Sequence, residues 1–192
     1  ILDVASAKGV DAATLTSKVT AALKAEIESK LAAGEITQEQ AERVVPLVER
    51  LAAEGVLVSV DTWKPPVADT AIAAGAGILN DVSGLADPGL ADVAARTGAG
   101  LVVMHTRAAP KEEHFADYGG RVVEDVEAFL RERMALARER GVAEEQLIAD
   151  PGPDFAKTPA ESAEVLRALP RLHALGRPIL LPVSRKYVIG AI

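Results

Sequence analysis

The sequence has 192 residues, 49% of them hydrophobic and 26% charged, which describes one globular domain with a sizeable core. Its formal net charge is −7 and no dense run of Lys and Arg is present, so nucleic acid and anionic membranes are poor candidate partners. It contains no cysteine, which excludes disulfides and thiolate chemistry and favours a reducing cytoplasm. No apolar run approaches the roughly 20 residues that cross a bilayer, and no stretch resembles a signal peptide.

Short apolar runs alternate along the chain with longer amphipathic ones. The short runs are rich in leucine or β-branched residues and continuous rather than alternating, which is typical of strands buried on both faces. They predict strands at 1–4, 56–61, 77–81, 101–105, 147–150 and 178–183. The chain begins at Ile1, inside the first of these runs, so we expect it to be a fragment of a longer protein.

The segment 5–40 is unusual because a long helix stands where a loop is expected after a first strand. Apolar residues recur in it every four positions and predict a helix over 11–33 that stops at Gly34. These residues are Leu15, Val19, Leu23, Ile27 and Leu31. We expect this helix to pack or to bind a partner rather than to carry catalysis.

The later predicted helices have recognisable ends. Thr37 and Gln40 indicate a capping box, and Gly55 ends the same helix just before the second strand. Three further helices open with a proline in or beside their first turn, where proline is tolerated. These openings are Pro65 with Pro66, Asp87 with Pro88, and Thr158 with Pro159, the last beginning a helix that extends to Gly176. Strand and helix in alternation predict a parallel α/β sheet.

Polar residues stand at the carboxyl ends of the predicted strands. They are Asp61, Asn80 with Asp81, His105, Asp150, and Ser184 with Arg185 and Lys186. In a TIM-type barrel of eight βα units these ends converge on one face around one pocket. An open doubly wound sheet is less favoured because the glycine-rich first turn typical of it is missing. The sequence therefore predicts a parallel (β/α) barrel, incomplete because about six of the eight strands are found.

Four motifs, in this order, carry a family resemblance. The stretches SVDTWKPPVADTAIAAGAGILNDVSG, LVVMHTR, DPGPDFAKT and VSRKYVIG resemble dihydropteroate synthase in order and approximate spacing. The resemblance implies one pterin-binding barrel domain over 1–192, truncated at both ends. It also implies a transferase of folate biosynthesis, the target of sulfonamides. Such an enzyme condenses dihydropterin hydroxymethyl pyrophosphate with p-aminobenzoate, releases pyrophosphate and uses magnesium.

The resemblance also assigns the pterin contacts. Asp150 matches the carboxylate that accepts the ring amide and the exocyclic amine in a fork, an arrangement that suits paired donors. Asp61 and Asn80 match the other polar contacts to the ring, and Met104 lines its face.

On the amine side, Lys186 matches the lysine that reaches both the pterin and the pocket of the incoming amine. Ser184 matches the residue that meets the aminobenzoate carboxylate, Arg185 stands beside it, and Phe155 forms a wall. The catalytic roles fall to Lys186 and Asp61, and no residue is assigned to a metal.

The sequence departs from the family pattern in several places. It reads as starting at the family's second strand and stopping after the seventh, so the loops that hold pyrophosphate and magnesium are missing. The segment after residue 4 differs from the family's loop over the aminobenzoate. Pro182 replaces a small residue, and Pro153 with Asp154 alters a glycine-rich turn.

Other functions stay open on the sequence alone. A methyltetrahydrofolate-type methyltransferase has a similar fold and also uses Asp and Asn against a pterin. A non-catalytic, regulatory pterin-binding paralogue is the third reading. The edge strands at 1–4 and 178–183 need covering, by a longer chain or by another one, and the resemblance implies a cytoplasmic homodimer.

Simpler roles also compete for single residues. Asp61 with Thr62 is a common way to end a strand and cap a helix, and Asn80 with Asp81 is a common turn. His105 has no second histidine at metal-ligand spacing. Lys157 and Lys64 are expected to be surface charges.

Overall fold

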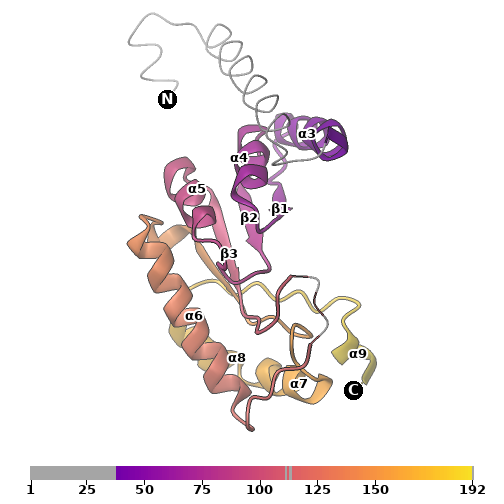
Figure 1. The fold of residues 1–192 in the computed structure, drawn as a ribbon, viewed down its shortest axis with the longest axis vertical. Coiled ribbons are helices and arrows are strands. Elements are labelled where there is room, and N and C mark those ends of the chain that lie inside the picture. Colours follow the sequence, from indigo (N-terminus) through magenta and orange to yellow (C-terminus); the bar gives the residue numbers. More distant parts are fainter. Residues whose placement is uncertain (1–37, 111, 113, 192) are drawn as a thin grey trace, which may run out of the picture.

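The computed structural model describes residues 38–110, 112 and 114–191 of the chain. Its centre is a sheet of four parallel strands in the order β1-β2-β3-β4 (Figure 1). The strands are β1 (Ser59–Asp61), β2 (Ile78–Asp81), β3 (Gly100–Met104) and β4 (Leu147–Asp150). Each strand pairs with the next one along the chain, which is the arrangement of consecutive βα units in a barrel wall. A doubly wound sheet would reverse its strand order at a switch point. The four described strands show no such reversal, and the predicted barrel class is confirmed.

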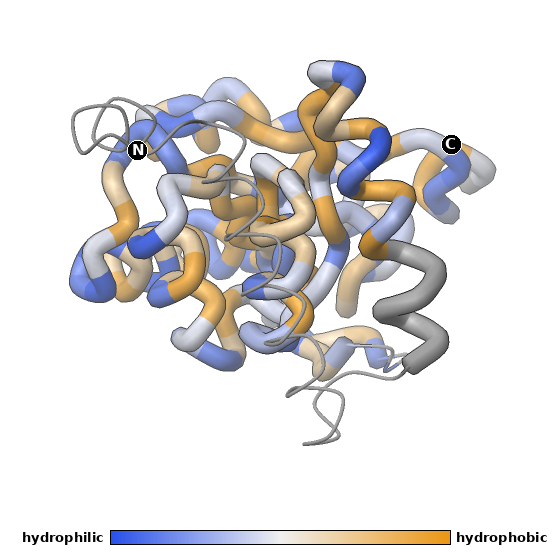
Figure 2. Tube along the Cα trace, turned by 90° about the horizontal axis from the view of Figure 1, so that it is seen from above, coloured by the Kyte–Doolittle hydropathy of each residue, from blue (hydrophilic) through white to orange (hydrophobic). Residues whose placement is uncertain are grey.

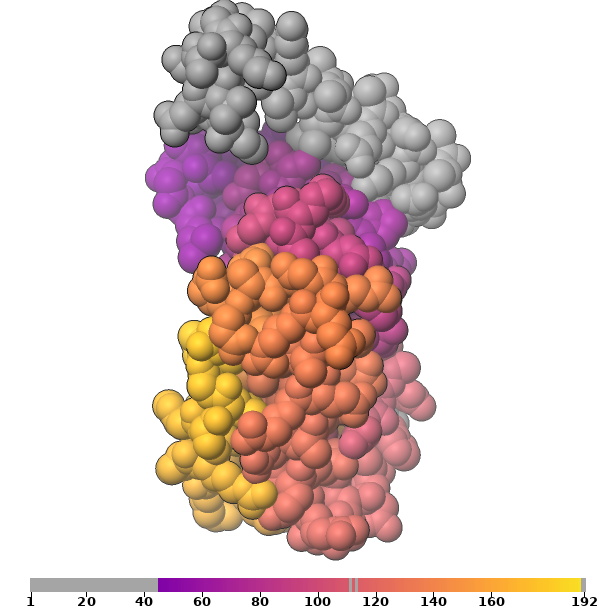
Figure 3. All heavy atoms as spheres, turned by 90° about the vertical axis from the view of Figure 1, so that its left-hand side faces the viewer, coloured from indigo at the N-terminus to yellow at the C-terminus, as the bar shows by residue number. Residues whose placement is uncertain are grey.

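Helices connect and follow the strands. They are α3 (Gln38–Ala53), α4 (Pro65–Ala73), α5 (Gly89–Thr97), α6 (Val122–Glu139), α7 (Pro159–Arg167), α8 (Leu169–Leu172) and α9 (Tyr187–Ala191), with short 3₁₀ turns η1 (Glu144–Gln146) and η2 (His173–Leu175). Helix α4 packs on α3 and α5, and α7 packs on α6 and α9. In the space-filling view of Figure 3, the magenta atoms of the α5 region lie directly against the orange segment that follows later in the chain.

The helix end predicted at Gly55 and the helix start predicted at Thr158 fit the structure. Gly55 has a φ of 79°, and the amide of Val56 donates to the carbonyl of Leu51 at 3.0 Å, which closes α3. Thr158 caps α7 by a capping box with Glu161. The predicted helix over 11–33, the capping box at Thr37 and the strand at 1–4 lie outside the described residues.

Two predictions about the last third of the chain were wrong. The run 178–183 forms no strand; only Ile179 makes a bridge with Ala149. Pro178 and Pro182 lie within the run, and because proline has no N–H it cannot donate to a ladder. The helix predicted to extend to Gly176 ends at Arg167 and continues as α8 and η2, because Pro170 interrupts the hydrogen-bonding pattern.

The core lies between the sheet and the helices. Its central residues have no exposed surface and come from successive strands and helices, among them Leu79, Leu90, Leu101, Leu130 and Leu147. A second, smaller cluster joins α3, α4 and β1 around Val48 and Ala71. Figure 2 shows hydrophobic and hydrophilic segments alternating along the helices, as one buried face requires. No helix in the described part of the chain is long and apolar enough to span a membrane.

Candidate active site

The carboxyl ends of the four strands lie along the same edge of the sheet, with the ends of β3 and β4 two residues beyond the row of Asp61 and Asn80. Asp61 is paired in register with Asn80, and Met104 with Asp150. The strand order places these residues along one edge of the sheet. The expectation that they lie along a common edge is therefore met.

Asn80 presents an acceptor that the protein leaves unused. Its side-chain Oδ1 is buried and accepts no hydrogen bond from the residues that the structure describes. A buried acceptor without a partner costs about 1 to 3 kcal/mol, so a donor on a ligand would be favoured here.

Asp81 has a different role from its neighbour. It is fully buried, and its Oδ1 accepts hydrogen bonds from the amide and the hydroxyl of Ser83 at 2.8 and 2.6 Å. Its Oδ2 accepts from the amide of Leu85 at 2.7 Å. Asp81 thus builds the turn after β2, and of the Asn80–Asp81 pair it is the turn-former. Loss of hydration, followed by the charge of Asp81, raises the pKa of Asp61 above its usual value, while Lys186 opposes this.

Asp150 sits at the end of β4 with 2% of its surface exposed. Burial raises its pKa to about 6, although the amide of Gly152 and the charges of Lys186 and Lys157 oppose the shift. The Gly152 amide donates to Asp150 Oδ1 at 2.8 Å. Gly152 has a φ of 61°, and a Cβ there would lie 2.1 Å from the carbonyl oxygen of His105. Only glycine fits this turn, which holds Asp150 against the end of β3.

Lys186 completes the cluster from the far end of the chain. Its Nζ lies 4.1 Å from the centre of the Phe155 ring, a cation–π contact. Its charge acts on the carboxylates of Asp61 and Asp150 and favours their ionised forms. The structure therefore brings together the two carboxylates, the lysine and the phenylalanine that the sequence singled out. Ser184 and Arg185 are exposed in the turn just before Lys186.

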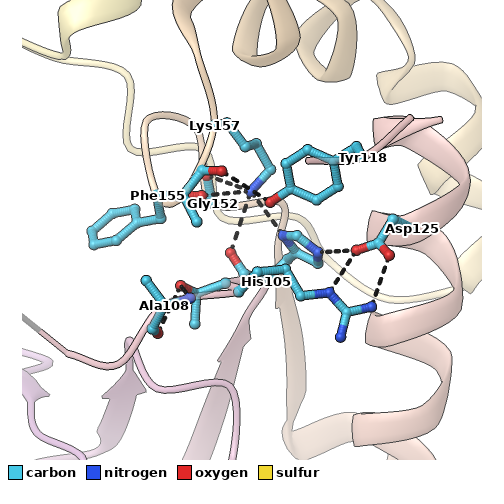
Figure 4. A network of polar contacts seen from close by, with 10 residues as sticks. His105, Ala108, Tyr118, Asp125, Gly152, Phe155 and Lys157 are labelled. Atoms are coloured by element: carbon cyan, nitrogen blue, oxygen red, sulfur yellow. Dashed lines mark hydrogen bonds and ion pairs between the residues drawn. The ribbon is translucent and has the colours of Figure 1, made fainter. Parts of the chain in front are cut away.

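Lys157 is not the surface charge that the sequence predicted. It is 1% exposed, and its Nζ contacts His105 Nδ1 at 2.8 Å (Figure 4). The same Nζ donates to the carbonyls of Gly152 at 2.9 Å and Phe155 at 3.1 Å. Burial lowers its pKa to about 7, although the charge of Asp150 favours the protonated amine. Sequence reasoning missed it because a single lysine after a turn carries no signal of burial.

His105 links Lys157 to helix α6. Its Nε2 lies 2.9 Å from Asp125 Oδ1, and Arg107 donates to both oxygens of that carboxylate at 2.9 and 2.8 Å. Burial and the charge of Lys157 lower the pKa of His105 to about 3, so the ring is neutral. Its Nε2–H then donates to Asp125 and its Nδ1 accepts from Lys157. Both ring nitrogens are engaged, which leaves neither for a metal.

The described residues contain no preformed site for magnesium. Among the residues that the structure describes, no three His, Asp or Glu side chains cluster closely enough to hold a metal ion. The described residues do not fit the magnesium that the resemblance implies, and no step below depends on it.

Comparison with known proteins matches this arrangement to a family. The family described as "pterin binding enzyme" matches residues 8–192. The chain belongs to this family. It is 46% identical over 154 residues to the "probable bifunctional folylpolyglutamate synthase/dihydropteroate synthase" of Halobacterium salinarum, covering 80% of the chain and 19% of that protein. It is 42% identical to the dihydropteroate synthase of Bacillus subtilis, covering 80% of the chain and 52% of the relative.

A solved structure extends the match to three dimensions. The dihydropteroate synthase of Xanthomonas albilineans in complex with 7,8-dihydropteroate superimposes with a TM-score of 0.70 at 41% identity, covering 80% of the chain and 56% of that protein. The chain thus spans about half the length of these single-function synthases.

Proposed function

We propose that the protein condenses dihydropterin hydroxymethyl pyrophosphate with p-aminobenzoate to give dihydropteroate and pyrophosphate. The observation that carries the proposal is the meeting of Asp61, Asn80, Asp150 and Lys186 at one edge of the sheet. The ligand bound to the Xanthomonas albilineans enzyme, 7,8-dihydropteroate, is the product of this reaction. A cytoplasmic location and a homodimeric assembly stay predictions of the family resemblance.

The pterin half of the site is the more fully built. Asp150 is buried and bonded to only one local amide, so its carboxylate can accept two parallel donors from the ring. The unused Oδ1 of Asn80 offers a further acceptor. Met104 is buried beside Gly152 and adds an apolar side chain at this end of β3. A flat ring with donors along one edge fits this set of groups.

The amine half rests on the segment around Lys186. Phe155 offers an aromatic wall, and the Nζ of Lys186 places a positive charge over its ring. Ser184 and the cation of Arg185 stand exposed two residues and one residue before Lys186 and suit the carboxylate of p-aminobenzoate. The amine nitrogen then faces the pterin methylene.

The chemistry demanded of these residues is mainly orientation and charge balance. The bond between the methylene carbon and the pyrophosphate oxygen breaks, and the oxygen keeps the electron pair. A bond from the amine nitrogen to the same carbon forms, and the nitrogen releases its proton. Asp61 and Asp150 stabilise positive charge developing on the pterin, while Lys186 orients the partners.

Dihydropteroate formation by the purified protein, followed by chromatography, tests this function. We expect product with the native protein and at least about tenfold less with Asp61→Asn, because a charge facing the reacting carbon is lost. Asp117→Asn changes an exposed carboxylate and serves as the matched control. Equal rates for all three proteins would remove Asp61 from the reaction.

A pterin-binding protein without turnover is the second candidate. It is favoured by the fact that Asp150 and the Oδ1 atom of Asn80, which would meet the ring, are buried, whereas Ser184 and Arg185 are exposed. Pterin binding without product would support it.

A further inference from the structure

Asp154 occupies a backbone conformation that favours glycine. It lies in the loop between β4 and α7 with a φ of 67°, and Ala156 follows at 54°. The left-handed region is disfavoured for most side chains, although Asp and Asn tolerate it better than others. A side chain that persists at such a position invites the question of what it contributes.

The carboxylate of Asp154 reaches across to the segment after Lys186. It accepts hydrogen bonds from the backbone amides of Tyr187 and Val188, the latter at 3.2 Å to Oδ1 and 3.3 Å to Oδ2. These amides begin helix α9 (Tyr187–Ala191), where the first N–H groups have no partner within the helix. An aspartate is well suited to satisfy them.

The backbone of Asp154 is itself anchored. Its amide donates to the hydroxyl of Ser162 at 3.0 Å, and Ser162 is fully buried in α7. Asp154 therefore ties the start of α9 to a fixed point in the core. The residue after Asp154 is Phe155, and the residue before Tyr187 is Lys186, so the tie connects the two side chains that meet at 4.1 Å.

We propose that Asp154 is a positioning residue that holds Lys186 over the Phe155 ring, beside Asp61 and Asp150, by capping the first amides of α9. The catalytic part of this inference rests on the proposed function, whereas the geometric part does not. Asp154 acts through Lys186 rather than on the substrates.

The geometric part is tested by nuclear magnetic resonance. The ring of Phe155 shifts the side-chain ε protons of Lys186 upfield, and Phe155→Leu identifies that shift. We expect Asp154→Gly, which suits the backbone but lacks the cap, to move these protons toward the position of a free lysine. It should also speed hydrogen exchange at Tyr187 and Val188 by about tenfold, the loss of one cap. Asp154→Asn keeps an acceptor oxygen, so its Lys186 proton shift and its exchange rates should lie between those of the native protein and of Asp154→Gly.

Exchange at Leu101 and Val103, buried in β3, reports on the fold as a whole and should not change. An unmoved Lys186 resonance and unchanged exchange in Asp154→Gly would overturn the proposal, whatever the protein's activity.

The catalytic part is tested by a double-mutant cycle on the release of pyrophosphate. Asp154→Gly should lower kcat/KM by about tenfold in the native background, but by less than about twofold in a Lys186→Ala background. A structural role alone would give equal losses in both backgrounds and would overturn the proposal. If the native protein releases no pyrophosphate, the proposed function fails, and the resonance of Lys186 still decides whether Asp154 positions it.

Discussion

The Nζ of Lys157 lies 2.8 Å from Nδ1 of His105, and both side chains are buried. Burial lowers the pKa of both groups, and the charge of Lys157 lowers that of His105 further. The pair joins the turn after β4 to the end of β3 and to Asp125 on α6. Lys157 also donates to the carbonyls of Gly152 and Phe155 in the loop after Asp150, so a buried polar network supports the candidate site.

Removing Lys157 should destabilise the protein strongly. Lys157→Met keeps much of the volume but leaves two carbonyls and His105 Nδ1 without their donor. We expect a loss of about 2 to 5 kcal/mol in the free energy of unfolding, measured with urea. Lys64→Met, at an exposed lysine, is the control and should change it by less than about 0.5 kcal/mol. Equal small effects would show that the network contributes little.

His105 should make stability depend on acid pH. Its pKa is about 3 in the folded protein against an ordinary 6.5, so between these values the unfolded chain binds a proton that the folded one does not. The contribution of neutral His105 to the free energy of unfolding is fully present above pH 6.5 and falls as the pH drops toward 3.

Urea titrations from pH 7 to 4 measure this slope. In His105→Gln it should be smaller by up to about 1.4 kcal/mol per pH unit. His173→Gln, at an exposed histidine, should keep more of the native slope than His105→Gln. A native slope in His105→Gln would contradict a buried neutral ring.

Pterin affinity should weaken as the pH falls through 6. Because burial raises the pKa of Asp150 to about 6, the carboxylate that accepts the ring donors becomes protonated below that value. Calorimetric titration with dihydropterin hydroxymethyl pyrophosphate should show this loss in the native protein.

In Asp150→Asn the affinity should be weaker by about 1 to 3 kcal/mol and should vary less between pH 5 and 7. Since the ligand's own protonation is common to both proteins, the difference between the two titrations isolates Asp150. Unchanged affinity in the variant would remove Asp150 from the site.

Gly152 should tolerate no side chain. A Cβ there would meet the His105 carbonyl oxygen at 2.1 Å, and backbone cannot yield as a flexible side chain can. Gly152→Ala should therefore cost at least about 3 kcal/mol and weaken pterin binding. Gly119→Ala is a matched control, because its φ of 56° is similar but nothing lies within 4 Å. It should cost only about 1 to 2 kcal/mol of backbone strain, measured by thermal unfolding.

The sequence predicted the strand ends well for a physical reason. A polar residue that ends an apolar run is placed by the strand itself, so Asp61, Asn80 and Asp150 could be located from local pattern alone. The parallel barrel class followed from the same alternation of strand and helix.

What the sequence could not predict depends on contacts between distant segments. The partners of Lys157 lie up to 52 residues away, and nothing near Lys157 in the sequence marks it as buried. The tie from Asp154 to Val188 spans 34 residues. The apolar run 178–183 predicts a strand that does not form, because Pro178 and Pro182 lack the N–H groups that a strand needs.

The most direct test of the proposed function is pyrophosphate release by this chain from dihydropterin hydroxymethyl pyrophosphate, with magnesium supplied, in the presence and absence of p-aminobenzoate. We predict release that requires the amine and that falls by at least about a hundredfold in Lys186→Ala, since that side chain meets both halves of the site. A folded protein that binds the pterin but releases no pyrophosphate, or releases it equally with and without Lys186, would contradict the proposed synthase activity.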